Sequence, residues 1–142
     1  KGVFPVGRLD KDSSGLIILT NDGRITKRLL SPEYYHEKEY VVSVKGKLRP
    51  NFKEKMEAGV QIDAEKTRPC KVEILSDKKF KVTITEGKKH QIRRMCVALF
   101  QEVDTLRRVR IMNIELGDLK DNAYRNIEGE ELSVLLKALE LI

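Results

Sequence analysis

The sequence predicts an α+β domain in which helices flank a central, largely antiparallel or mixed β-sheet. Three observations support this fold class. Two runs, at 70–75 and 80–85, alternate apolar and polar residues with the period of a strand. Other segments carry apolar residues at helical spacing instead. The two kinds of segment do not alternate in the regular order of a parallel βαβ fold.

Length and composition limit the architecture. A chain of 142 residues predicts one domain with a single core of moderate size. It is 40% hydrophobic and 35% charged, and no apolar run approaches the roughly 20 residues of a membrane helix. Residues 1–6 do not resemble a signal peptide, so we expect a cytoplasmic location. Cys70 and Cys96 have no Cys or His at ligand spacing, so we expect no zinc site.

Turn residues divide the first half of the chain into short elements. The predicted order is a buried strand at 16–20, a helix at 23–30, a strand at 40–44 and a helix at 50–58. The first strand is predicted from an unbroken apolar run, and the second from β-branched residues that follow a polar loop at 34–39. Pro50 and Gly59 stand where helices commonly begin and end.

The second half begins with the alternating runs, which predict a β-hairpin with one face in water. From residue 88 the apolar spacing becomes helical, with a stripe of Ile92, Met95, Cys96 and Leu99. Two more strands are predicted at 101–106 and 108–116. Leucines at helical spacing predict a terminal helix, namely Leu132, Leu135, Leu136 and Leu139.

Positive charge is concentrated in one stretch. The formal net charge is +6, and residues 78–110 alone carry ten Lys or Arg against three Asp or Glu. This concentration indicates a surface that binds a polyanion. The alternative is a solvated basic face. An aromatic content of 6% argues against single-strand binding by serial base stacking alone.

Asp10 is the first candidate for a functional acid. It ends the segment Gly7-Arg8-Leu9-Asp10, between a glycine and the apolar run, and Arg8 and Lys11 are neighbouring cations. Nearby cations favour an ionised carboxylate, so this environment suits an acid that must stay charged. The alternative is that Asp10 caps a turn, a common role for Asp in short polar segments.

Residues 86–95 follow a predicted strand and open a predicted helix, where backbone N–H groups and lysines suit a phosphate group. Arg93 and Arg94 project from the flanks of the apolar stripe. A guanidinium near the start of this helix is well suited to pair with a carboxylate such as Asp10. A second basic patch, predicted to contact RNA backbone, consists of Arg107, Arg108 and Arg110.

Other enzyme classes receive little support from the sequence. It contains neither a P-loop nor a GxGxxG motif. His36 and His90 accompany no Ser or Cys nucleophile in a recognisable turn, so we expect both to be structural hydrogen-bonding groups. Asp10 and Asp12 would lie on opposite sides of a strand, unlike the two flanking acids of a glycosidase.

Three ordered motifs resemble those of the RNA pseudouridine synthases. The first is GRLD at 7–10 with Ser13, Gly15-Leu16 and then TNDG at 20–23. The second is EKEY at 37–40, and the third runs from Glu86-Gly87 through HQIRRM at 90–95. Together they are similar to the RsuA-like branch, which modifies ribosomal RNA. The run RVRIMN at 108–113 is closer to large-subunit members than to small-subunit ones.

The resemblance implies the pseudouridine synthase fold and specific roles. Asp10 would be the catalytic aspartate, which either attacks C1′ of the target ribose or removes the 2′ proton. Tyr40 would stack on the target base, and Arg93 would pair with the aspartate. The reaction is an isomerisation that needs no cofactor or metal, and the target uridine must first be flipped out of folded rRNA. We predict RNA contacts at Arg8, Lys11, Lys88, Lys89, His90, Gln91, Arg94, Arg107, Arg108 and Arg110.

The sequence also departs from the family. We expect a single catalytic domain over 1–142 without the branch's usual N-terminal portion, which comprises an S4-like RNA-binding domain and an LNKP element. Asn122 replaces a common turn glycine, and Glu128 replaces a Thr that often caps the last helix. A non-catalytic RNA-binding or ribosome-assembly module with the same fold is the alternative function.

Overall fold

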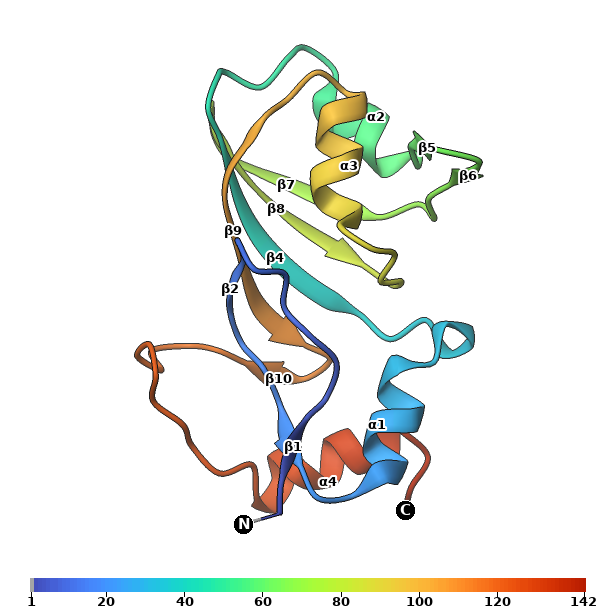
Figure 1. The fold of residues 1–142 in the computed structure, drawn as a ribbon, viewed down its shortest axis with the longest axis vertical. Helices are drawn as coiled ribbons and strands as arrows, with labels where there is room; N and C mark the ends of the chain where they lie inside the picture. Colours follow the sequence, from blue (N-terminus) through green and yellow to red (C-terminus); the bar gives the residue numbers. More distant parts are fainter. Residues whose placement is uncertain (1) are drawn as a thin grey trace.

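The computed structural model describes residues 2–142. The molecule is elongated, and two long strands connect an upper and a lower lobe (Figure 1). These strands are β4 (Lys38–Val44) and β9 (Val103–Ile111). The upper lobe also contains α2 (Phe52–Glu57), α3 (Gln91–Ala98) and the strands β5 to β8; the lower lobe contains β1, β3, α1 (Gly23–Leu30), β10 and α4 (Gly129–Ala138).

A six-stranded mixed sheet forms the frame, as predicted. Its order is β10-β9-β4-β8-β7, and these neighbours are antiparallel. The remaining strand, β2 (Ser14–Gly15), pairs with β9 in parallel. The predicted hairpin is confirmed as β7 (Lys71–Ser76) and β8 (Lys79–Ile84), and β10 comprises Ile114–Glu115.

Short pairs and helices complete the fold. β1 (Phe4–Pro5) pairs with β3 (Leu19–Thr20), and β5 (Gln61–Ile62) pairs with β6 (Glu65–Lys66). A 3-10 turn at Pro32–Tyr34 follows α1. All four predicted helices are confirmed, with ends that differ by up to three residues. In residues 2–142 no helix has both the length and the apolar character that crossing a bilayer requires.

The predicted strand at 16–20 is wrong in extent. Only its last two residues form strand, in β3, while β2 ends just before it. Leu16 and Ile18 are buried, whereas Ile17 and Leu19 are partly exposed. Residues 16–18 pass from one pairing, with β9, to another, with β1, so this apolar run crosses between sheets and does not lie within one.

The two strands predicted at 101–106 and 108–116 form one long strand and a short one. β9 continues through Arg107 and Arg108, because both take part in its pairing with β4. The chain turns at Met112, which adopts φ 53°, before β10 begins. Asn122 adopts the left-handed conformation (φ 62°) expected of a residue that replaces a turn glycine, and Glu128 precedes α4 without a side-chain cap.

The prediction of a single core is wrong, because buried apolar residues form two clusters. The upper cluster lies between the sheet and α2 and α3, around Phe80, Met56 and Met95. The lower cluster joins β10, α1 and α4, around Leu29 and Leu135. Members of both clusters, among them Ile84 and Leu29, line one cavity between the lobes together with polar side chains.

An irregularity in the β4–β9 pairing shapes the sheet surface at this cavity. The register shifts between Glu39 and Tyr40, so that Lys38 pairs with Ile111 while Tyr40 pairs with Arg108. Without the shift, side chains at 108 and 111 would point to opposite faces of the sheet. With it, both Arg108 and Ile111 border the cavity, together with Lys38 and Tyr40.

Candidate active site

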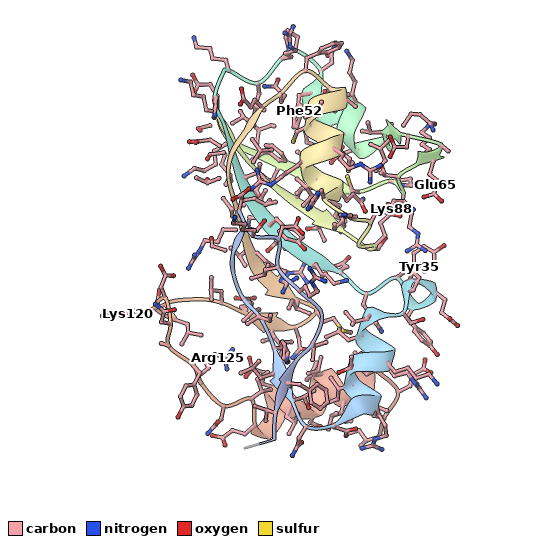
Figure 2. The ribbon with its side chains drawn as sticks, in the orientation of Figure 1. Tyr35, Phe52, Glu65, Lys88, Lys120 and Arg125 are labelled. Atoms are coloured by element: carbon pink, nitrogen blue, oxygen red, sulfur yellow. The ribbon has the colours of Figure 1, made fainter. Side chains whose placement is uncertain are left out.

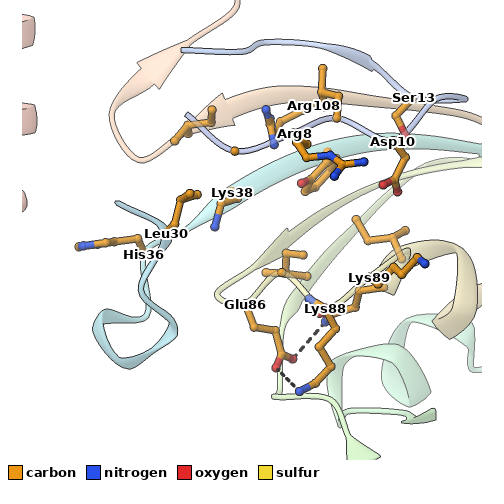
Figure 3. A pocket seen from close by; sticks show the side chains of 18 of the residues that line it. Arg8, Asp10, Ser13, Leu30, His36, Lys38, Glu86, Lys88, Lys89 and Arg108 are labelled. Atoms are coloured by element: carbon orange, nitrogen blue, oxygen red, sulfur yellow. Dashed lines mark hydrogen bonds and ion pairs between the residues drawn. The ribbon is translucent and has the colours of Figure 1, made fainter. Parts of the chain in front are cut away.

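A cavity of about 730 Å³ lies between the two lobes. It is bordered by the segment 7–10 and Ser13, by β4 and β9, and by the loop 86–91 that precedes α3. Figure 3 shows Asp10 and Arg8 on one side and Glu86, Lys88 and Lys89 on the other. All three motifs that the sequence singles out therefore contribute to one cavity.

Asp10 lies in a turn at the edge of the cavity. The turn is closed by a hydrogen bond from the Ser13 N–H to the Asp10 carbonyl (2.9 Å). The Asp10 carboxylate is 39% exposed, and His90 Nε2 lies 3.7 Å from its Oδ1. His90 occupies the N-cap position of α3 with φ 51°, a left-handed conformation that directs the chain into the helix. The acid is thus accessible and has an imidazole beside it.

Arg93 does not form the ion pair with Asp10 that the sequence suggests. Its Nη2 donates a hydrogen bond to the carbonyl oxygen of Asp12 (2.8 Å), and its Nε is buried without a partner in residues 2–142. The guanidinium projects from the first turn of α3 and reaches the backbone just beyond Asp10. In this structure Arg93 holds the loop that carries Asp10 and does not contact the carboxylate.

Tyr40 lies on the sheet surface of the cavity. Its ring packs against the upper core, and its strand neighbours are Val82 and Arg108. Lys38 lies two residues earlier on the same face. The aromatic ring of Tyr40 and the ammonium group of Lys38 therefore belong to the same surface of the cavity.

The loop 86–91 is organised by Glu86, which sequence reasoning did not select as a site residue. Its buried carboxylate accepts hydrogen bonds from the Arg68 N–H (2.6 Å) and from Gln91 Nε2 (3.0 Å). Gln91 Oε1 in turn accepts from the Lys88 N–H (3.1 Å). Gln91 is 4% exposed and its amide is used inside the protein, while the RNA contact predicted there stays a prediction. The sequence signal that could have identified Glu86 is its position as an acid within a basic stretch.

Several predicted RNA-binding cations have acidic partners instead. Lys88 Nζ lies 2.7 Å from Glu65 and 3.5 Å from Glu86, and Arg94 pairs with Asp63. Figure 2 shows Lys88 and Glu65 close together at the edge of the upper lobe. The Lys88 ammonium lowers the pKa of Glu65, and Glu65 raises the pKa of Lys88. Their charges are balanced locally.

Arg110 is also paired, on the face of the sheet opposite the cavity. Its Nη2 lies 3.2 Å from Glu37, its Nε lies 3.5 Å from Glu39, and its Nη1 donates to the Met112 carbonyl (2.7 Å). Only 20% of the side chain is exposed. Its guanidinium is used by two acids and a carbonyl group, and the RNA contact predicted for Arg110 stays a prediction. The register shift at Glu39 accounts for its orientation.

The remaining cations with predicted RNA contacts fall into three groups. Arg8 and Lys89 are exposed at the cavity, and Lys11 is exposed next to it. Arg107 lies outside the cavity, where it donates to Ser14 Oγ (3.2 Å) and lies 3.3 Å from Asp121. Arg108 borders the cavity but is buried, and its Nε donates to the Leu16 carbonyl (2.9 Å).

Tyr35 and Arg68 contact each other next to residues that border the cavity, His36 and Glu86, and the sequence analysis did not predict this contact. The guanidinium carbon of Arg68 lies 3.9 Å from the centre of the Tyr35 ring. Arg68 also donates to the Thr85 carbonyl (2.7 Å), while Tyr35 follows the 3-10 turn with φ 56°. A contact between a residue after α1 and one before β7 has no local sequence signal.

Titratable groups near the cavity show the effect of burial. Burial lowers the pKa of Lys38, and the neighbouring Arg108 charge lowers it further. Burial also raises the pKa of Cys70 to about 11 and that of Cys96 to about 12, so both thiols stay protonated at neutral pH. Within residues 2–142 no group of three or more His, Cys, Asp or Glu could hold a metal ion.

Comparison with known proteins assigns this chain and its fold to one class. Residues 1–98 match the family model described as RNA pseudouridylate synthase. The chain belongs to this family, which confirms the family predicted from the three motifs. It is 43% identical over 140 residues to the dual-specificity RNA pseudouridine synthase RluF of Escherichia coli (strain K12), covering 99% of this chain and 48% of that protein.

Two further likenesses agree. The chain is 38% identical over 134 residues to the ribosomal small subunit pseudouridine synthase A of Pasteurella multocida (strain Pm70), covering 92% of this chain and 58% of that protein. A crystal structure of a pseudouridylate synthase superposes with a TM-score of 0.90 at 35% identity, over 94% of this chain and 59% of the other. This confirms the predicted fold. The chain spans about half the length of the curated relatives it matches.

Proposed function

We propose that this chain is a catalytic domain that converts a uridine of ribosomal RNA to pseudouridine. The observation that supports the proposal best is the position of Asp10, an accessible carboxylate at the edge of a cavity whose floor carries Tyr40. Membership of the RNA pseudouridylate synthase family supports the same reaction. We propose that it acts in the cytoplasm.

In the proposed reaction a flipped uridine occupies the cavity, with its base on Tyr40 and its ribose at Asp10. Asp10 acts on the ribose, and the N1–C1′ bond breaks. The uracil turns within the cavity, C5 forms a bond to C1′, the C5 proton leaves to solvent and N1 gains a proton. Arg93 holds the Asp10 loop through the carbonyl of Asp12. No atom other than protons is exchanged with solvent.

Cations around the cavity would bind the RNA backbone on either side of the flipped nucleotide. Arg8, Lys11 and Lys89 are the exposed cations at or next to the cavity, so we assign phosphate contacts to them first. The run at 108–113 favours large-subunit (23S) rRNA as substrate, while the name of the Pasteurella relative refers to the small subunit. Both RNAs are therefore included in the test.

The test measures tritium released from 23S and 16S rRNA transcripts that carry [5-³H]uridine. We expect release from 23S rRNA with the unaltered chain and, for Asp10→Asn, a loss of release on the order of 10³-fold with RNA binding retained. Asp104→Asn, an exposed acid on β9, is the matched control and should leave release unchanged. Release that Asp10→Asn does not alter, or no release from either RNA, would favour the non-catalytic RNA-binding module.

A further inference from the structure

Lys38 and Arg108 place two cations next to each other at the sheet surface of the cavity. Both border the cavity, and the Arg108 charge is close enough to lower the pKa of Lys38. Figure 3 shows the two side chains on the same side of the cavity. The proposed function so far gives neither of these cations a catalytic role.

Arg108 is buried, and not all of its hydrogen-bond donors have partners. It is only 5% exposed, and its Nε is used by the Leu16 carbonyl. Its Nη2 is buried and has no partner in residues 2–142. A guanidinium nitrogen that is removed from water and left unpaired is costly, so a site that keeps one is suited to a ligand that supplies an acceptor.

Lys38 has no acidic partner either. The flanking acids Glu37 and Glu39 point to the opposite face of the sheet, where both pair with Arg110. No carboxylate of residues 2–142 forms an ion pair with Lys38. Two cations that are partly removed from water and share no counter-ion repel each other, and negative charge between them relieves this repulsion.

We propose that Lys38, with Arg108, binds the carbonyl edge of the target uracil and stabilises the negative charge on that base after its bond to ribose breaks. This inference rests on the proposed function. When the N1–C1′ bond breaks, the electron pair stays on N1, and the charge spreads to the O2 and O4 carbonyl oxygens. The pair of cations offers hydrogen-bond donors to those oxygens. The later bond from C5 to C1′ consumes this charge, and the C5 proton leaves to solvent.

The strand geometry places these donors beside a base stacked on Tyr40. Lys38 and Tyr40 are two residues apart on one face of β4, a separation of about 6.8 Å along the strand. Arg108 pairs directly with Tyr40 on the neighbouring strand. The cations therefore border the aromatic surface on two sides. Donors fixed before the reaction stabilise developing charge more than water does, because they need not reorganise.

The test uses Lys38→Met, which keeps the length of the side chain but removes its charge. We expect the single-turnover rate of tritium release from 23S rRNA to fall about 10²-fold to 10³-fold, the range found when one such donor is removed. The dissociation constant for RNA and its dependence on salt should not change, because no phosphate contact is lost. Lys38→Arg should recover part of the rate. Lys55→Met, an exposed lysine of α2, is the matched control.

A change in the leaving group distinguishes charge stabilisation from a structural role. 5-Fluorouracil is more acidic than uracil, so its anion requires less stabilisation by neighbouring cations. The rearranged nucleoside is measured after digestion of RNA that contains 5-fluorouridine. Lys38→Met should lower its rate of formation by a smaller factor than it lowers the rate with uridine. An equal penalty for both bases would overturn the inference.

Three other results would also contradict it. A weaker RNA affinity with a lower salt dependence in Lys38→Met, at unchanged single-turnover rate, would assign Lys38 to a backbone phosphate. An unaltered rate would show that Lys38 has no catalytic role while leaving the proposed function intact. If the unaltered chain itself releases no tritium, the proposed function fails, and this inference fails with it. Thermal unfolding of Lys38→Met checks the fold, which loss of a half-buried cation should not weaken.

Discussion

Two segments face each other across the cavity and are held in different ways. The loop 86–91 is anchored from inside: Glu86 and Gln91 are buried and hydrogen-bonded, and Lys88 pairs with two acids. The segment 7–14, which carries Asp10, is mostly half-buried or exposed. It is held at its end by the pairing of β2 with β9, and in its middle by the hydrogen bond from Arg93.

The difference shows how the position of the proposed catalytic acid is determined. The anchors of the loop 86–91 are Glu86 and Gln91, within the loop itself, and Glu65 and Arg68, which lie about 20 residues earlier in the chain. The anchors of the segment 7–14 are on β9 and α3, more than 80 residues away. Mutations at these distant anchors should therefore affect Asp10 more than mutations among the paired cations.

The largest expected effect comes from Gly15→Ala, which breaks the β2 anchor. Gly15 adopts φ 112°, and a Cβ there would collide with the backbone of Arg108, including its carbonyl oxygen. We expect a loss of about 3 kcal/mol or more in the free energy of unfolding, measured with urea. Gly46→Ala is the control: nothing lies within 4 Å of its added Cβ, so it should change stability by less than about 0.5 kcal/mol.

Arg93→Ala tests the second anchor and should mainly affect the reaction. Loss of the hydrogen bond to the Asp12 carbonyl frees the Asp10 loop, and a shift of about 1 Å can cost 10²-fold in rate. We expect a fall of that size in single-turnover tritium release, with RNA affinity nearly unchanged and partial recovery in Arg93→Lys. The exposed Arg24→Ala should be neutral. A fall in affinity without a fall in rate would instead assign Arg93 to RNA backbone.

The smallest expected effect is on the salt dependence of RNA affinity, which should differ between cations that have acidic partners and cations that do not. Removing the exposed Lys89 should lower the slope of log affinity against log salt by about 0.7, the value for one contact with single-stranded nucleic acid. Lys88→Ala should change the slope less, because Glu65 and Glu86 already balance that charge. Fluorescence anisotropy at several salt concentrations measures both. Equal changes in slope would show that pairing does not limit which cations bind RNA.

Local pattern was enough to predict much of this fold. The helices, the hairpin and the α+β class follow from periodicity, caps and turn residues, which act over a few positions. The prediction failed where neighbours distant in sequence decide the outcome. Residues 16–18 cross between two pairings, and Arg107 and Arg108 continue a strand because β4 pairs with them.

The site shows the same division. The sequence by itself determined which segments border the cavity, because Asp10, Tyr40 and the loop 86–91 belong to motifs that can be read directly. Only the tertiary structure decided which charges are available there. The register shift at Glu39 turns Arg110 toward acids and leaves Lys38 and Arg108 facing the cavity. Ion pairing and burial depend on side chains brought together from distant strands, and this proximity leaves no local pattern in the sequence.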